Sequence, residues 1–284
     1  MSKQAIRVSA DSTCDLSPEL LNKYGIETLP LYAVLEGKAY KDGLEITPDE
    51  IYAKVKEIGK IGSTAAINVD EYITFFTHMK ESCDTLIHFV ISSEMSSCCQ
   101  NALIAAAEVG GVYVIDSRNL STGIALLVLR ACELAEKGMA AEVVVSAIRE
   151  MLGRVDATFV PENLEYLKMG GRCSAAAALG ANLLRIKPCI QVKEGTMTVG
   201  KKYTGNTEAV LTKYVGDRLR DVESLDLSRI FVVHSGMNNP ALVDKVKEAV
   251  LAIAPFEEVL EARAGCTISN HCGPNTLGLL FCRK

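Results

Sequence analysis

The feature that most restricts the fold of this chain is the alternation of strands and helices in its first half. Short apolar segments typical of strands occur at 6–10, 85–91 and 112–115. Each is followed by a polar turn and then by a segment with helical character. Strands separated by helices indicate βαβ units, whose strands pair in parallel. This half is therefore predicted to form a parallel sheet covered by helices.

Capping residues mark where the helices of this half begin and end. A helix is predicted over 18–24, because Ser17 is a favoured N-cap and a proline and a glycine stand at its two ends. Another is predicted over 48–58, where Thr47 and Glu50 form a capping box. Further helices are predicted after Asn68, over 100–109 and over 121–137.

The pattern changes after about residue 150. Strands are predicted at 190–192, 196–199, 230–234 and 277–281, and helical segments at 161–169, 174–184, 207–219 and 240–253. The longer spacings and the mixed strand patterns favour an α+β unit. The predicted fold class is α/β, with a parallel-sheet N-terminal domain packed against an α+β C-terminal domain.

Composition and charge exclude several classes of protein. Of 284 residues, 49% are hydrophobic and 23% charged, which is enough apolar material for a core. The formal net charge of −5 and the absence of tryptophan argue against a nucleic-acid-binding surface. The most apolar segment, 123–129, is ended by Arg130 and is too short to cross a membrane.

The cysteines indicate a reducing compartment. The chain has ten, but no CxxC pair, and several stand among apolar neighbours as small hydrophobic residues do. We also find no secretory signal at the N-terminus. These observations favour reduced thiols and a cytoplasmic location.

The serine-rich segment 91–100 is the most informative candidate site. It lies between an apolar strand and a helix, so that its hydroxyls and backbone N–H groups would face the positive end of the helix dipole. In open parallel sheets ligands collect at the carboxyl ends of strands, and this segment is at such an end. The alternative is that these serines only cap the helix.

Three other residues are candidates for binding. Thr64 lies in a short polar stretch before a helix, Arg172 follows two glycines, and His271 stands two residues before a Gly-Pro turn. A guanidinium can hold a carboxylate or phosphate, and a histidine can act as hydrogen-bond donor or base. Structural roles for all three stay open. The histidine spacing does not indicate a metal site, and none is predicted.

Familiar catalytic and nucleotide-binding signatures are missing. The chain has no GxGxxG, GxxxxGK[ST] or GxSxG segment. The serines and His271 leave one enzymatic hypothesis open, a serine/histidine hydrolase of acyl esters. That hypothesis lacks an evident acidic partner for the histidine.

Five segments, in order, resemble the DegV family over essentially the whole chain. Residues 10–16 are similar to its opening D-S-T-x-D-L, and Thr64 matches the threonine of its T-S-Q-P segment. Residues 91–100 resemble its I-S-S-x-x-S-G-T-Y-Q segment. Residues 165–172 resemble its E-Y-L-x-x-G-G-R segment, and residues 271–274 its H-x-G-P segment.

The resemblance implies a protein that binds a long-chain fatty acid, such as palmitate, stearate or oleate, in a tunnel between two domains. It implies no further cofactor and no catalysis by the chain itself. The carboxylate would be held by Thr64 and by Ser96, with Ser93 as the second choice. Arg172 and His271 would lie near the head group or on a surface that faces a partner. The apolar segments 103–107 and 175–184 are candidate tunnel walls.

The family's domain organisation and partner are implied in the same way. The N-terminal domain would comprise 1–60 and 75–153, and the C-terminal domain 61–74 and 154–284, with the lipid between them. Some members present the carboxylate to a separate, ATP-dependent fatty acid kinase subunit that makes an acyl-phosphate. Members with such a partner carry an arginine where this chain has Tyr203.

Overall fold

The computed structural model describes residues 4–177 and 186–284 of the chain. Its N-terminal half contains a sheet with the strand order β2-β1-β6-β7 in which every pairing is parallel, as predicted. The strands are β1 (Gln4–Asp11), β2 (Glu27–Leu29), β6 (Cys83–Val90) and β7 (Val112–Asp116).

Helices cover this sheet, and two of them begin where the sequence predicts. Ser17 accepts a hydrogen bond at the start of α1 (Pro18–Tyr24), and Gly25 ends that helix with φ of 61°. Asn68 and Glu71 form a capping box at the start of α3 (Val69–Lys80). The other helices of this half are α4 (Cys98–Val109), α5 (Thr122–Glu136) and α6 (Ala141–Met151).

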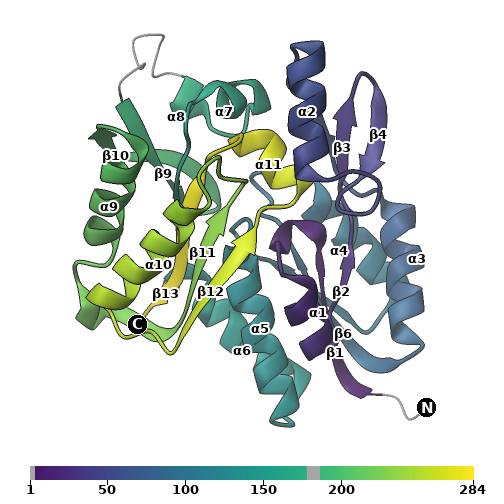
Figure 1. The fold of residues 1–284 in the computed structure, drawn as a ribbon. Coiled ribbons are helices and arrows are strands. Elements are labelled where there is room, and N and C mark those ends of the chain that lie inside the picture. Colours follow the sequence, from purple (N-terminus) through teal and green to yellow (C-terminus); the bar gives the residue numbers. More distant parts are fainter. Residues whose placement is uncertain (1–3, 178–185) are drawn as a thin grey trace.

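A small antiparallel sheet, which the sequence patterns did not predict, stands beside the parallel one (Figure 1). Its strand order is β4-β3-β5, with β3 (Tyr32–Leu35), β4 (Lys38–Lys41) and β5 (Ser63–Ala65). It packs with α2 (Pro48–Ile58), whose capping box at Thr47 is as predicted, and with α11 (Cys266–Cys272). Because α11 comes from the C-terminal end of the chain, this small unit joins distant parts of the sequence.

The C-terminal half contains a mixed sheet with the order β10-β9-β8-β13-β11-β12. Its strands are β8 (Val155–Val160), β9 (Ile186–Lys193), β10 (Thr196–Thr204), β11 (Leu225–His234), β12 (Glu258–Arg263) and β13 (Leu277–Arg283). The helices are α7 (Glu165–Gly170), α8 (Ser174–Ala177), α9 (Thr207–Arg218) and α10 (Ala241–Ile253). Short 3-10 turns occupy Ser12–Cys14, Leu152–Arg154 and Val222–Ser224.

Two predicted helical segments differ from the observed elements. The segment predicted at 161–169 is helical only from Glu165, where the Asn163 side chain accepts the Glu165 N–H. Of the alanine-rich segment 174–184, the structure describes α8, and 178–184 lies outside the described residues.

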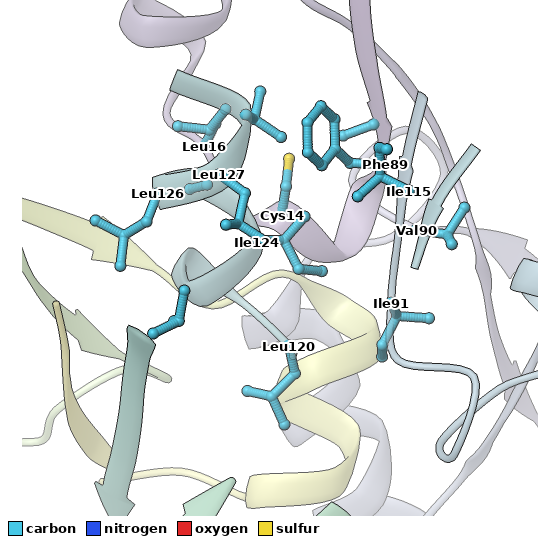
Figure 2. Packing of buried hydrophobic residues seen from close by; sticks show 14 of the residues in the cluster. Cys14, Leu16, Phe89, Val90, Ile91, Ile115, Leu120, Ile124, Leu126 and Leu127 are labelled. Carbon is cyan, nitrogen blue, oxygen red and sulfur yellow. The ribbon is translucent and has the colours of Figure 1, made fainter. Parts of the chain in front are cut away.

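Helix α5 joins the two halves, because it contacts strands of both large sheets (Figure 1). Most of its side chains are buried, and one hydrophobic cluster extends from the parallel sheet through α5 to the mixed sheet. Figure 2 shows part of this cluster, with Cys14 among Leu16, Phe89 and Ile124. Burial of apolar surface on both sides of α5 therefore holds the two sheets together.

The mixed sheet is buried on both faces. In β11, Phe231 packs in the α5 cluster, whereas Ile230 and Val232 pack in a second cluster with α9 and α10. Successive side chains of a strand point to opposite faces, so this double burial explains the unbroken apolar run at 230–233 of the strand.

The segment 61–74, expected to cross to the C-terminal domain, lies in two places. Residues 63–65 form β5, which pairs with β3 and contacts α11. Residues 69–74 begin α3, which packs on α4 and β6 of the N-terminal half. The domain boundaries stay a prediction. In the described parts of the chain, no helix is long and apolar enough to cross a membrane.

Candidate functional site

The site lies where the order in which the chain adds strands to the parallel sheet reverses. In the order β2-β1-β6-β7, the chain leaves β1 toward one edge and β6 toward the other, so the carboxyl ends of β1 and β6 flank a topological switch point. Asp11 at the end of β1 accepts a hydrogen bond of 2.8 Å from the Ile91 N–H, just after β6. Burial raises the pKa of Asp11 to about 6.

An apolar pocket lies between this edge and the mixed sheet. The space between its lining atoms is about 1020 Å³, part of which is open to solvent. Its walls come from both halves of the chain and are mainly apolar, including Leu31, Ile91, Met95, Leu120, Ala157, Phe159, Met197, Val233, Ile268 and Leu280.

Four of the five residues predicted to bind the ligand line this pocket, although they are far apart in the sequence. They are Thr64, Ser96, Arg172 and His271. The proposed wall at 103–107 does not line it: Leu103 and Ile104 of α4 are each 47% exposed.

Thr64 and His271 are in direct contact. Pairing of Thr64 with Ala33 of β3 places the threonine at the pocket. His271 lies in the last turn of α11 rather than in a loop, and its Nε2 is 2.9 Å from Thr64 Oγ1. Burial, and then the positive charge of Arg172, lowers the pKa of His271 to about 4. The imidazole is therefore neutral near pH 7 and carries a single N–H.

The position of that proton follows from the surroundings of the ring. His271 Nδ1 is buried and has no hydrogen-bond partner in the described parts of the chain. A proton there would be a buried donor without an acceptor, so we assign it to Nε2. Nε2–H then donates to Thr64 Oγ1, and the Thr64 hydroxyl hydrogen is free to point into the pocket.

Gly170, at the end of α7, provides the space for the His271 ring. A Cβ at this position would overlap Nδ1 and lie 3.1 Å from Cε1 and 3.2 Å from Cγ of His271. The first glycine of the Gly-Gly-Arg segment is thus needed for close packing, whereas Gly171 has φ of 69° and ends the helix.

We expect Gly170→Ala to displace His271 and break its hydrogen bond to Thr64. If the chain binds the fatty acid that the family resemblance implies, its affinity, measured by displacement of a fluorescent analogue, is expected to fall about tenfold or more. Gly216→Ala is the matched control, because nothing lies within 4 Å of a Cβ there. Equal affinity of the two variants would show that the ring position does not matter for binding.

Ser96 lies beside the N-terminus of α4. Its hydroxyl accepts the Cys98 N–H at 3.3 Å and donates to Cys98 Sγ at 3.2 Å. The capping alternative is thus partly correct, since the oxygen satisfies a backbone donor of the first turn. Sulfur is a weak acceptor, so the hydroxyl hydrogen remains available to a stronger one.

Arg172 is exposed at the edge of the pocket. Its Nη1 donates to Gly170 O at 3.0 Å, and its Nε is 3.4 Å from Met95 O. These contacts tie the turn after α7 to the serine-rich segment. They hold a positive charge near His271 without neutralising it.

Ser93 lies apart from these residues. It is exposed, and its Oγ donates to Asp116 Oδ2 at 2.6 Å. The neighbouring Ser92 is buried and donates to Gly195 O at 2.7 Å, in the turn between β9 and β10. Ser92 therefore connects the two halves of the chain, Ser93 is bonded within the N-terminal half, and neither serine lines the pocket.

Two buried aspartates that the sequence analysis did not single out hold α11 in place. Asp42 accepts hydrogen bonds from Cys266 N at 2.7 Å and Thr267 N at 2.9 Å, so it caps the helix that carries His271. Asp15 accepts the Gly265 N–H at 2.9 Å. Asp15 lies in the D-S-T-x-D-L segment, but that segment did not indicate this role.

The arrangement does not resemble a hydrolase triad. His271 Nε2 contacts Thr64 rather than Ser96, and no carboxylate orients the other ring nitrogen within the described residues. In the same parts of the chain, no group of three His, Cys, Asp or Glu side chains is placed to hold a metal ion.

Fold and site define an α/β protein with two large sheets and, between them, an apolar pocket whose lining includes the polar residues Thr64, Ser96 and His271. A sequence model of a family described as an uncharacterised protein of the DegV family matches residues 5–284. The chain belongs to the DegV family.

Solved and curated relatives resemble the whole chain. A DegV family protein from Thermus thermophilus, described by its fatty acid binding, is 32% identical with a TM-score of 0.91, over 99% of this chain and 100% of that one. A stearic acid-binding protein from Eubacterium ventriosum is 25% identical with a TM-score of 0.83, over 100% and 99%. A fatty acid-binding protein of Thermotoga maritima is 29% identical over 282 residues, 96% of each chain.

Proposed function

We propose that this protein binds one long-chain fatty acid, with its carboxylate at Thr64 and Ser96 and its tail along the apolar pocket. The observation that carries the proposal is the Thr64 hydroxyl, which is hydrogen-bonded to a neutral histidine and lines a pocket with mainly apolar walls. The relatives from Thermus thermophilus and Eubacterium ventriosum are described as fatty acid-binding. Palmitate, stearate and oleate are the expected ligands.

The head group would be held by hydroxyl donors. His271 donates to the oxygen of Thr64, so the Thr64 hydroxyl hydrogen must point away from the histidine. A carboxylate is the strongest acceptor that could meet it in the pocket. The Ser96 hydroxyl would turn from Cys98 Sγ to the same carboxylate. The N-terminus of α4 adds a favourable electrostatic field for the negative charge.

The tail would supply most of the affinity. Burial of each CH₂ group contributes about 0.8 kcal/mol, so a chain of roughly sixteen carbons provides ample free energy to offset the ordering of the ligand. The polar part needs only to replace the hydrogen bonds that the carboxylate loses on leaving water.

We further propose that the chain acts as a carrier and that any chemistry occurs on a partner. The bound acid would be presented to a separate, ATP-dependent kinase subunit, which would form an acyl-phosphate. The chain has no P-loop segment of its own. Tyr203 stands where kinase-partnered members carry an arginine. Its ring is buried against Tyr214, with ring centroids 6.3 Å apart, so the tyrosine places no aromatic group on the surface. The ten buried thiols favour a cytoplasmic location.

Native mass spectrometry of the protein purified from a bacterial host tests the proposal. We expect one bound acyl chain for each polypeptide, and uptake of palmitate or oleate after the lipid is removed. Protein that contains no lipid and takes up neither acid would contradict the proposed function. Turnover of a chromogenic acyl ester that is lost in His271→Ala would instead favour the hydrolase hypothesis.

A further inference from the structure

A polar atom of the pocket is left without a partner by the protein. Thr267 is 3% exposed and lines the pocket, and its Oγ1 makes no hydrogen bond with the described residues. Among the described residues, the other buried pocket-lining atom of this kind is His271 Nδ1, four residues later on the same helix. Buried hydroxyls normally have a partner, because burial without one costs free energy.

Four other hydroxyls of the lining donate to, or share a hydrogen bond with, groups of the protein. Ser121 donates to Asp15, Thr158 bonds to Tyr214, Ser235 donates to Gly273 O and Thr276 donates to Cys272 O. These bonds explain how polar residues are tolerated in an apolar wall. Thr267 does not follow this rule.

The position of Thr267 in α11 explains why its hydroxyl is left over. A threonine inside a helix usually bonds to the carbonyl four residues earlier. Thr267 is the second residue of α11, whose N-cap is Gly265, so the carbonyl four residues earlier belongs to β12 rather than to a preceding turn. Its backbone N–H is already held by Asp42. The side chain is therefore the one group of this residue that a ligand can satisfy.

Helix geometry places this hydroxyl close to the head group. Residues four apart lie on the same face of a helix, separated by about one turn of 5.4 Å. Thr267 is thus about one turn from His271, whose Nε2 contacts Thr64. A group bound there would belong to the first few carbons of the acyl chain and not to its distal part.

We propose that Thr267 recognises an oxygen substituent near the carboxyl end of the ligand, so that the preferred ligands are fatty acids with a hydroxyl group at carbon 2 or 3. This inference rests on the proposed function and extends it to the class of acyl chain. The Thr267 hydroxyl then gains a partner, and the ligand hydroxyl, which is equally costly to bury alone, is satisfied in the same bond. An unsubstituted acid leaves Thr267 unpaired.

The test compares two proteins and several acids. Dissociation constants of palmitate, 2-hydroxypalmitate, 3-hydroxypalmitate and 12-hydroxystearate are measured for the delipidated wild type and for Thr267→Val, in which a methyl group replaces the hydroxyl. The affinity ratio of hydroxy acid to palmitate is expected to be about tenfold or more higher in the wild type, for at least one of the 2- and 3-isomers. For 12-hydroxystearate the ratio should not change.

Thr122→Val is the matched control. Thr122 is also fully buried and its Oγ1 makes no hydrogen bond within the described part of the chain, but it lies in α5 and does not line the pocket. Its removal should leave all affinity ratios unchanged. Equal ratios in the wild type and Thr267→Val for both proximal isomers would overturn the inference while palmitate still binds. Failure of every acid to bind the wild type would instead overturn the proposed function on which the inference rests.

Discussion

Combining Thr64→Val with Ser96→Ala is expected to weaken fatty acid binding by a factor of about 10² to 10⁴. Each hydroxyl would donate to a charged carboxylate, and such a bond contributes about 1.5–3 kcal/mol. Loss of both hydroxyls also leaves the carboxylate without hydrogen-bond donors. Burial of an unpaired charge beside apolar side chains is costly, so the acid can no longer enter the pocket as deeply. Isothermal titration or displacement of a fluorescent fatty acid measures the change.

Ser93→Ala provides the matched control, because Ser93 belongs to the same serine-rich segment but is exposed and bonded to Asp116. Its affinity for fatty acid should equal that of the wild type. Thermal unfolding of the double variant should stay close to that of the wild type, since Thr64 and Ser96 are only partly buried. Unchanged affinity in the double variant would mean that the head group lies elsewhere in the pocket.

The elements predicted well from the sequence are those with local signals. The capping box at Thr47 and the N-cap position of Asn68 indicated the starts of α2 and α3, and apolar segments indicated β6 and β7. These signals act within a few residues, so they do not depend on the rest of the fold.

The elements missed have boundaries set by distant contacts. The strands β3 and β5 are short, and β5 is ordered by pairing with a strand about thirty residues earlier. Helix α11 has neither an N-cap side chain of its own nor an acidic residue in its first turn. Its cap is Asp42, more than two hundred residues away in the chain. No local pattern can show a helix whose cap comes from another part of the sequence.

The candidate site divides in the same way. The carboxyl end of β6 was predictable, because parallel strands place ligands at that edge. The pairing of Thr64 with His271 was not, since it requires the small sheet and α11 to meet. The need for glycine at position 170 was not predictable either, because it arises from the close approach of the His271 ring. Resemblance to a family named these residues, but only the structure gives each a physical role.

The dependence of the site on a distant cap leads to the largest expected effect on stability. Asp42→Ala removes the acceptor of two backbone N–H groups of α11, and of the Ser12 hydroxyl at 3.2 Å. Asp42 is 5% exposed, so water cannot readily replace it. Each buried donor left unpaired costs about 1–3 kcal/mol, and the helix also loses a negative charge at its N-terminus. We expect the free energy of unfolding to fall by roughly 3–5 kcal/mol in urea denaturation.

Asp49→Ala is the control that distinguishes loss of this buried cap from loss of an ordinary surface charge. Asp49 forms an ion pair of 2.6 Å with Arg263, shortly before α11, but its side chain is 80% exposed. Exposed pairs contribute at most about 1 kcal/mol, so its loss should be small. If Asp42→Ala were as mild as Asp49→Ala, α11 would be held by its other contacts, and His271 would keep its place without the cap. If Asp42→Ala is as destabilising as expected, fatty acid affinity should also fall under conditions where the variant is still folded. The reason is that α11, which positions His271 beside Thr64, has lost its N-terminal cap.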